Sequence, residues 1–137
     1  MGRRYPMPMP FGWYAIAYSD ELERGDAIPV TYFAKDLVLF RTESGKACLL
    51  DAYCPHLGAH LGHGIHENTG RGGRIQGESI VCPFHAWKFN GDGICTDVPY
   101  AKAMPPKIKG KKCLTSYPIV ETNQVVWAWY HPDGSEP

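Results

Sequence analysis

Apolar residues gather in short runs along this chain, and the three-to-four-residue spacing of an amphipathic helix is hard to find. Runs of this length, rich in β-branched and aromatic residues and bounded by turn-forming residues, are typical of β-strands. The clearest are Trp13–Tyr18, Ile28–Phe33, Leu37–Arg41, Ala47–Leu50, Ser79–Val81, Ala86–Phe89 and Gln124–Tyr130. Only Ser19–Glu23 reads as a helical turn, with Ser19 as its N-cap.

Turn-forming residues separate these runs, at 43–46 (ESGK), 90–93 (NGDG) and 121–123 (ETN). The Asn90-Gly91 and Asp92-Gly93 pairs suit a tight hairpin, because asparagine and glycine tolerate a positive φ. A content of 15 glycines and 12 prolines agrees with a chain rich in loops. We therefore predict an all-β fold built from several small antiparallel sheets.

Two segments depart from this pattern. Residues 52–72 are rich in histidine and glycine with little strand character, so we expect a long loop, and loops of that length are usually functional or disordered. Residues 100–112 are rich in proline and lysine and are expected to form a solvated crossing segment.

Length and charge narrow the possible classes of protein. At 137 residues the chain has the usual size of one domain, so residues 1–137 are assigned to a single domain. Its 14 basic and 14 acidic residues cancel, and charge gives no reason to expect nucleic acid or an anionic membrane as a partner. The apolar runs are far shorter than the roughly 20 residues that span a bilayer. Prolines follow Arg3 and Arg4 without an apolar signal core, so a cytoplasmic protein is expected.

Two short segments hold the residues with metal-binding chemistry. Cys54 and His56 lie in CPHLGAHLG, and Cys82 and His85 lie in CPFHAWKF. Each segment begins with Cys-Pro where a strand passes into a loop, and the proline restricts φ and so the direction of the sulfur. Five cysteines without a secretion signal argue against a disulfide framework and favour metal ligands, redox groups or buried small residues.

A set of two cysteines and two histidines has two serious interpretations. Zinc would take four such ligands tetrahedrally, typically with the two cysteines in one segment and the two histidines in another. Here each segment contributes one of each. That pairing suits a binuclear [2Fe–2S] cluster with both thiolates on one iron and both imidazoles on the other, which we favour over zinc and over four unliganded core residues.

The two segments resemble the cluster-binding loops of Rieske proteins. The flanking stretches PFGWYAIAYSDEL, LLDAYCPH, FNGDG and VWAWYHPDG resemble more specifically the N-terminal domain of Rieske non-haem iron oxygenases. CTDVPYAKAMPPK is similar to the branch that contains steroid ring hydroxylases and sterol desaturases. The resemblance implies a Rieske-type fold with cluster-binding loops at 54–64 and 82–93, and Cys54, His56, Cys82 and His85 as the ligands of the [2Fe–2S] cluster.

The resemblance also implies a role in electron transfer. The electron would come from a reductase or a ferredoxin. It would leave through His56 or His85 toward a mononuclear non-haem Fe(II) site in a further domain that this sequence does not contain. As part of a longer chain the protein would be the oxygenase component of an oxidoreductase, and a homo-oligomer is then possible. The alternative is a complete, stand-alone Rieske ferredoxin without a substrate of its own.

Two features depart from Rieske relatives. Respiratory Rieske proteins join their loops by a disulfide, but Ala59 and Phe84 stand at the matching positions here, so that bond cannot form. We expect a reduction potential toward the lower end of the Rieske range, about −150 mV rather than +300 mV.

Between His56 and Cys82 lie 25 residues, more than the resemblance leads us to expect. We interpret 65–72 (IHENTGRG) as an insertion in a surface loop.

The remaining candidates have simpler explanations. His60, His63 and His66 recur every third residue, but a glycine-rich loop gives three ligands no fixed face, so we expect solvent or packing roles. Five further residues and one segment receive structural expectations: Cys48 and Cys95 as buried small hydrophobes, Cys113 as similar or partly exposed, His131 at the surface, Trp87 as a shield for the cluster or a core residue, and Lys107–Lys112 as a solvated face.

Overall fold

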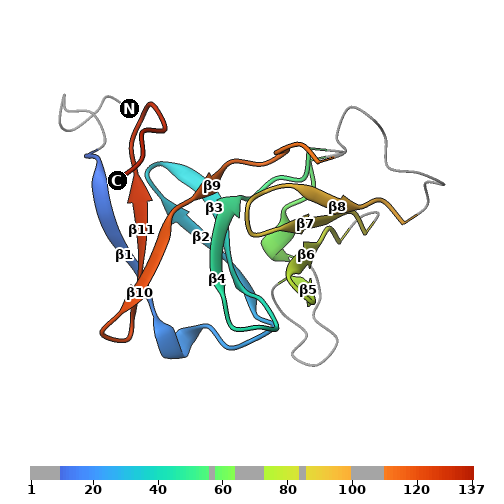
Figure 1. Ribbon diagram of the computed structural model, residues 1–137, viewed down its shortest axis with the longest axis horizontal. Helices are drawn as coiled ribbons and strands as arrows, with labels where there is room; N and C mark the ends of the chain where they lie inside the picture. Colours follow the sequence, from blue (N-terminus) through green and yellow to red (C-terminus); the bar gives the residue numbers. More distant parts are fainter. Residues whose placement is uncertain (1–9, 56–57, 64–72, 84–85, 100–109) are drawn as a thin grey trace.

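The computed structural model describes residues 10–55, 58–63, 73–83, 86–99 and 110–137, which form three small antiparallel sheets (Figure 1). The first sheet contains β1 (Gly12–Tyr18), β11 (Val125–Tyr130) and β10 (Ile119–Thr122), in that order. The second contains β2 (Ala27–Tyr32), β3 (Lys35–Arg41), β4 (Ala47–Asp51) and β9 (Ser116–Tyr117). The third contains β5 (Arg74–Gln76), β6 (Ser79–Val81), β7 (Lys88–Asn90) and β8 (Cys95–Asp97). The predicted all-β fold is confirmed.

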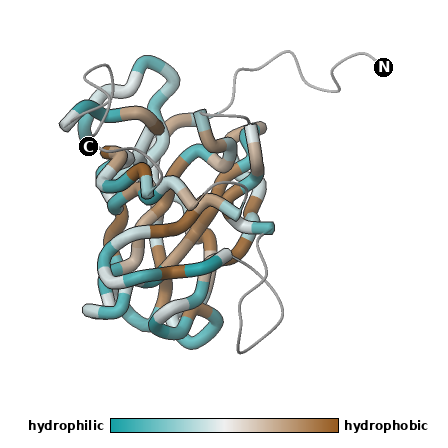
Figure 2. Tube along the Cα trace, turned by 90° about the vertical axis from the view of Figure 1, so that its right-hand side faces the viewer, coloured by the Kyte–Doolittle hydropathy of each residue, from teal (hydrophilic) through white to brown (hydrophobic). Residues whose placement is uncertain are grey.

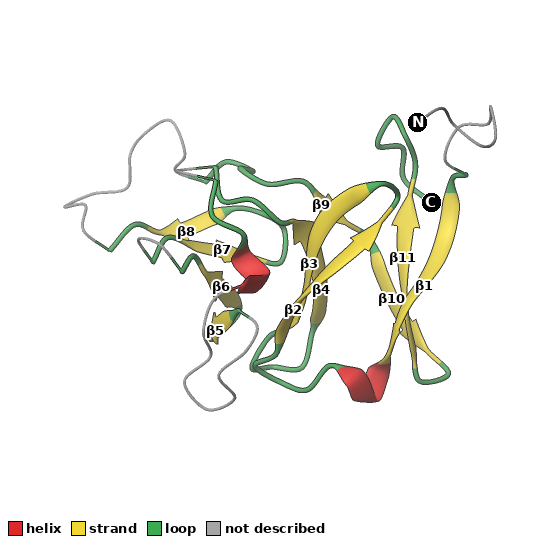
Figure 3. Ribbon diagram, turned by 180° about the vertical axis from the view of Figure 1, so that it is seen from behind, coloured by secondary structure: helices red, strands yellow, loops and turns green. Residues whose placement is uncertain are grey.

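Helical structure in the described residues is limited to two 3₁₀ turns, η1 (Ser19–Glu21) and η2 (Leu61–His63) (Figure 3). The predicted helical turn is therefore present, but Ser19 is its first residue and not its N-cap. The cap is Tyr18, whose backbone N–H donates to the Glu21 carboxylate at 2.8 Å and so gains a partner at the helix start. No helix in this part of the chain is long and apolar enough to cross a membrane.

The second sheet is the middle layer of the molecule, and β3 is buried on both of its faces. Leu37 and Leu39 belong to a core cluster shared with the first sheet, whereas Val38 and Phe40 belong to a cluster shared with the third. This explains why β3 is a continuous apolar run instead of an alternating one. Each such side chain stabilises the fold by about 1.5–3 kcal/mol. Figure 2 shows hydrophobic residues along the inner strands and polar residues at the turns.

Two hairpins turn through non-glycine residues with positive φ. Phe33 (φ 51°) and Ala34 (φ 60°) connect β2 to β3, and Asn123 (φ 51°) and Gln124 (φ 62°) connect β10 to β11. Two successive residues of this kind match the right-handed twist of the flanking strands. The turn predicted at 121–123 was therefore misplaced, because residues 121 and 122 pair within β10.

Several short strands carry too few apolar residues to be found in the sequence. The strands missed are β5, β8, β9 and β10, each of two to four residues. β5, for example, pairs with β6 through Arg74↔Val81 and Gln76↔Ser79 because a tight turn at 77–78 brings the two together. Such strands form because a neighbour offers backbone hydrogen bonds and not because of their own propensity.

An ion pair joins the first and second sheets. Arg41, at the end of β3, donates to both carboxylate oxygens of Glu121 in β10, at 3.0 and 2.7 Å. The same guanidinium also donates to the carbonyl oxygens of Leu22 at 2.6 Å and Gly45 at 2.8 Å. The hydrogen bond from Arg41 lowers the pKa of Glu121 from 4.5 to about 2. Arg41 thus connects a strand, two loops and a hairpin.

Candidate metal centre

The two cysteines expected to bind a metal lie in loops on the side of the second sheet that faces the third. Cys54 follows β4, and Cys82 follows β6. Both side chains are almost completely buried, at 1% and 3% exposure, and both belong to the core cluster between these sheets. The fold therefore brings together two cysteines that are 28 positions apart in the sequence.

The two loops repeat one backbone hydrogen-bond pattern. The Cys54 N–H donates to the Ala59 carbonyl at 2.8 Å, and the Gly58 N–H donates to the Cys54 carbonyl at 2.8 Å. In the second loop, the Cys82 N–H donates to the Trp87 carbonyl at 2.7 Å, and the Ala86 N–H donates to the Cys82 carbonyl at 3.0 Å. The backbone of each cysteine thus bonds to the backbone of the residues four and five positions later. Each loop therefore presents its cysteine from a turn of the same kind.

The residue four positions after each cysteine has the same backbone conformation in both loops. Gly58 has a φ of 79° and Ala86 a φ of 60°, both in the left-handed region. Glycine adopts this region without strain, whereas alanine is disfavoured there by about 1–2 kcal/mol. Because the second loop keeps this conformation in spite of an alanine, the turn around each cysteine is imposed by the surrounding fold.

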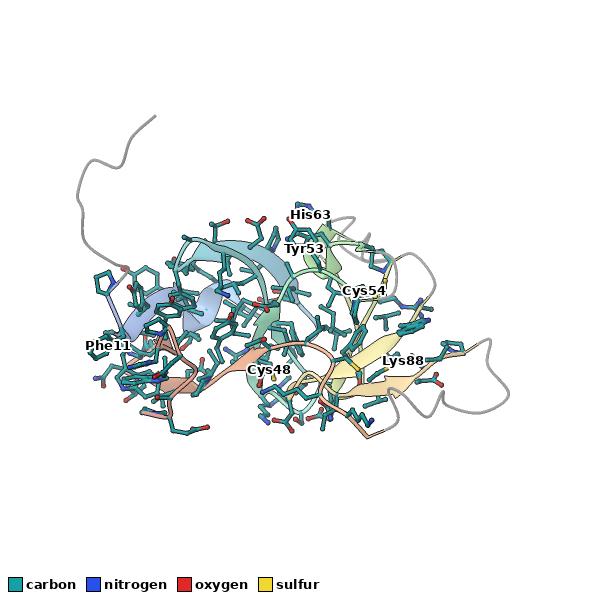
Figure 4. All side chains as sticks on the ribbon, turned by 90° about the horizontal axis from the view of Figure 1, so that it is seen from above. Phe11, Cys48, Tyr53, Cys54, His63 and Lys88 are labelled. Carbon is teal, nitrogen blue, oxygen red and sulfur yellow. The ribbon has the colours of Figure 1, made fainter. Side chains whose placement is uncertain are left out.

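Three further contacts order the first loop, and one of them joins it to the second sheet. The Tyr53 hydroxyl donates to the Asp36 carboxylate at 2.7 Å, and Tyr53 forms a β-bridge with His60. The Leu61 N–H donates to the Ala52 carbonyl at 2.8 Å. Figure 4 shows Tyr53, Cys54 and His63 in one region of the molecule. The sequence did not indicate the Tyr53–Asp36 contact, because its partners lie on different elements 17 residues apart.

The arrangement of the cysteines suits a metal better than it suits bare thiolates. A thiolate buried in an apolar core is strongly destabilised unless a positive charge is close, and a coordinated metal ion supplies that charge. Burial of Cys54 and Cys82 is thus compatible with metal ligation, and their role as two ligands of one centre stays a prediction. The predicted imidazole ligands, His56 and His85, lie outside the described residues. Within the described residues, no group of three or more histidine, cysteine, aspartate or glutamate side chains has an arrangement that could hold a metal ion.

The other cysteines occupy structural positions, as predicted. Cys48 is 3% exposed, and burial raises the pKa of its thiol to about 11. Cys95 is 2% exposed, and burial also raises the pKa of its thiol. Cys113 is half-buried against the same core cluster. A raised pKa keeps a thiol protonated and unreactive, so Cys48 and Cys95 act as small apolar residues.

His60 and His63 come together, but their contacts suit packing. Their ring centroids are 4.2 Å apart, and burial, followed by the charge of His63, lowers the pKa of His60. His60 Nδ1 accepts a hydrogen bond from the Gly62 N–H at 3.0 Å, so the neutral ring carries its proton on Nε2. Neither ring nitrogen of His60 then has an available lone pair for a metal. His66, with the rest of the interpreted insertion at 65–72, lies outside the described residues.

The remaining predicted residues fall as follows. Trp87 is half-buried and packs against the core cluster that contains Cys82. His131 is half-buried near the C-terminus, where it contacts Asp133 and lies against the Phe11 ring. Ala59 packs against the core cluster of the cysteines, whereas Phe84 lies outside the described residues. Most of the crossing segment 100–112 is also outside them, and Lys111 and Lys112 are exposed.

Comparisons with known proteins show the family to which the chain belongs. The family model of the Rieske [2Fe-2S] domain matches residues 12–118. The chain is 39% identical over 137 residues to cholesterol 7-desaturase nvd 1 of Ciona intestinalis, covering all of this chain and 27% of that protein. It is 39% identical over 126 residues to the oxygenase component of a 3-ketosteroid-9-alpha-monooxygenase of Rhodococcus rhodochrous, covering 92% of this chain and 30% of that one.

Solved structures resemble the chain in fold. Apo dicamba monooxygenase matches with a TM-score of 0.74 and 27% identity, over 94% of this chain and 36% of that one. The oxygenase of carbazole 1,9a-dioxygenase, solved in a complex with its ferredoxin, matches with a TM-score of 0.69 and 24% identity, over 89% of this chain and 30% of that one. The chain thus spans about a third or less of the length of these proteins, and it matches their N-terminal part.

Proposed function

The chain belongs to the Rieske [2Fe-2S] domain family, and we propose that Cys54, His56, Cys82 and His85 hold its cluster. The domain implies a [2Fe–2S] cluster and a role in electron transfer. The observation that carries the ligand assignment is the repeated turn, which presents Cys54 and Cys82 from the same backbone conformation in one buried cluster. His56 and His85 are the histidines that follow these cysteines in the sequence, two and three positions later.

Each pair of ligands has a different task in this proposal. When bound, the cluster accepts and releases one electron at a time. The buried cysteines exclude water from the sulfur side and anchor the centre in the core between the second and third sheets. The histidines each keep a second ring nitrogen that can bind a proton or a partner's hydrogen-bonding group, so His56 and His85 are the exit for the electron.

We further propose that the domain serves a longer oxygenase that acts on a sterol or steroid ring. Support comes from the identity to a cholesterol 7-desaturase and to a 3-ketosteroid-9-alpha-monooxygenase component. A reductase or ferredoxin would supply the electron, as the complex of the carbazole oxygenase with ferredoxin illustrates for a protein of the same fold. A mononuclear iron site beyond this chain would receive it.

Metal content and absorption of the purified chain test the cluster. The expected result is a red-brown protein with broad visible bands and about two iron and two sulfide per chain. A colourless chain loaded with zinc would contradict the proposal, because tetrahedral zinc is the other centre that two cysteines and two histidines form.

Substitution of one histidine tests the ligand set. His85→Ala should abolish assembly of the cluster, because one iron would lose half of its protein ligands. His63→Ala is the matched control. It removes a histidine of the first loop whose ring packs against His60 and which the proposal does not count as a ligand, and it should keep full iron content. A normal cluster in His85→Ala, or its loss in His63→Ala, would show that the ligand set is wrong.

A further inference from the structure

Each cysteine loop closes on a pair of residues, one directly before its cysteine and one six positions after it. In the first loop this pair is Tyr53↔His60, and in the second loop it is Val81↔Lys88. In the view of Figure 4, Cys54 lies between Tyr53 and Lys88. Both pairs are antiparallel, so the two loops begin and end at equivalent places. We call these two pairs the loop bases.

The base of the second loop is the end of a continuous ladder. Val81↔Lys88 is followed by two further pairs between β6 and β7. Ile80 and Phe89, which form the next pair, are fully buried. A buried ladder of this kind stabilises its own pairs through both backbone and side chains. The position of Cys82 is therefore fixed by the third sheet itself.

The base of the first loop has no such ladder among the described residues. Tyr53↔His60 is an isolated bridge outside the named strands. The next contact is a single backbone hydrogen bond, from the Leu61 N–H to the Ala52 carbonyl at 2.8 Å. Two strand segments paired this briefly are marginally stable in water. The first loop therefore needs support from outside its own backbone.

The chain after the first loop gains that support by packing on the second sheet. Leu61 is fully buried in the core. A Cβ added at Gly62 would lie 3.0 Å from the backbone nitrogen of Pro29 in β2, so the two backbones are in close contact. This packing supports only the half of the loop base that follows Cys54.

Asp36 supports the chain before Cys54 through two of its groups. Its carbonyl accepts from the Ala52 N–H at 3.2 Å, and its carboxylate accepts from the Tyr53 hydroxyl at 2.7 Å. Asp36 lies in β3 and pairs there with Thr31 of β2, so it is itself held within a sheet. A hydrogen bond to a carboxylate is charge-assisted and stronger than one between neutral groups.

We propose that Tyr53 and Asp36 are positioning residues for the cluster, and that their hydrogen bond does for the first loop what the ladder does for the second. Tyr53 acts through its neighbour Cys54, because restraining one residue limits the directions in which the next side chain can point. The Tyr53 ring also meets the His60 ring edge to face, at 5.2 Å between centroids, so it is held from two sides. The inference rests on the proposed cluster.

Loss of iron to a chelator tests the pair in the cluster-loaded chain. Tyr53→Phe keeps the ring and removes only the hydroxyl. It should speed the loss of iron by about threefold or more, because the first loop would open more often. An unchanged rate would overturn the proposal.

Tyr117→Phe is the matched control. It removes a hydrogen bond of the same kind, from the Tyr117 hydroxyl to the Asp51 carboxylate at 2.7 Å. Tyr117 packs against the core cluster shared with the first sheet, on the side of the second sheet away from the cysteines. At a temperature where both variants stay folded, Tyr117→Phe should lose iron at the wild-type rate. Equal acceleration in Tyr117→Phe and Tyr53→Phe would contradict the proposal.

A double-mutant cycle shows whether Asp36 acts through Tyr53. Asp36→Ala should speed the loss of iron as Tyr53→Phe does. The double variant should be no faster than the faster single variant, because the same hydrogen bond can be lost only once. Asp36→Asn keeps an acceptor oxygen and should restore part of the wild-type rate. Fully additive effects of the two single substitutions would contradict the pair.

Electron paramagnetic resonance of the reduced cluster separates positioning from general stability. Tyr53→Phe should shift and broaden the signal, because contacts around the ligands set the electronic structure of the cluster. Tyr117→Phe should give the wild-type signal even though it lowers the unfolding temperature. A wild-type signal in Tyr53→Phe would leave a structural role alone and overturn the proposal.

Amide hydrogen exchange followed by mass spectrometry separates a failure of this inference from a failure of the proposed function. Tyr53→Phe should speed exchange in the first cysteine loop by about threefold and leave exchange in β6 and β7 unchanged. That result in a colourless chain would reject the proposed function and support the restraint of the first loop. A coloured chain with unchanged exchange in Tyr53→Phe would support the function and overturn the inference.

Discussion

At the scale of single residues, Gly58 and Ala86 show how closely the two cysteine loops correspond. Both have a left-handed backbone conformation, and the N–H of each donates to the carbonyl of the cysteine four positions earlier. Only one is a glycine, so the correspondence is not visible from residue type. It became visible only when the hydrogen bonds placed both residues in the same position of a turn.

Exchanging glycine and alanine at these positions should have unequal effects on stability. Gly58→Ala should lower the free energy of unfolding by about 1 kcal/mol or more, since the φ of 79° is unfavourable for alanine, while an added Cβ meets no atom of the described residues within 4 Å. Ala86→Gly should change it by less than about 0.5 kcal/mol, because relief of strain offsets the greater freedom of the unfolded chain. Urea denaturation measures both. A larger loss for Ala86→Gly than for Gly58→Ala would contradict the equivalence of the loops.

At the scale of elements, the hairpin of β10 and β11 shows where sequence patterns fail. Glu121 and Thr122 look like turn residues, but the chain turns two residues later, at Asn123 and Gln124. Glu121 pairs with Val126 within the strand, and Arg41 on another sheet binds its carboxylate. The ion pair joins residues 80 positions apart in sequence, so no local pattern could indicate it.

The turn itself offers a stabilising substitution. Gln124 has a φ of 62°, and Asn-Gly is the preferred pair for a two-residue hairpin of this kind. Gln124→Gly should therefore raise the free energy of unfolding by about 0.5–1 kcal/mol. Thermal unfolding followed by circular dichroism would measure it as a higher unfolding temperature. A lower unfolding temperature would show that the turn does not control this hairpin.

The ion pair between the sheets predicts a dependence of stability on pH. Because the pKa of Glu121 is lowered from 4.5 to about 2, its contribution is present above pH 4.5 and is lost as the pH falls toward 2. Glu121→Gln should lower stability at pH 7 by about 1 kcal/mol. The difference between wild type and variant should shrink between pH 4.5 and 2. A difference that is constant over this range would contradict the ion pair.

At the scale of the whole molecule, the order of the sheets explains which parts of the fold were predictable. The run at 37–41 identified β3 because burial on both faces makes a strand continuously apolar. The short strands β5, β8 and β9 carry no such signal, because they depend on neighbours that fold beside them. The cysteines proposed as ligands could be picked out because their spacing reflects chemistry, and their role as ligands stays a prediction, whereas the anchoring of Tyr53 by Asp36 needed the fold to be seen.

The centre of this account is one cluster bound by two cysteines and two histidines in two equivalent turns. Electron–nuclear double resonance on the dithionite-reduced chain, grown with ¹⁵N-labelled histidine, tests it most directly. The account predicts a [2Fe–2S] signal with couplings from two imidazole nitrogens, both lost in His85→Ala together with the cluster. A chain without an iron–sulfur signal, or a cluster without nitrogen coupling, would contradict it.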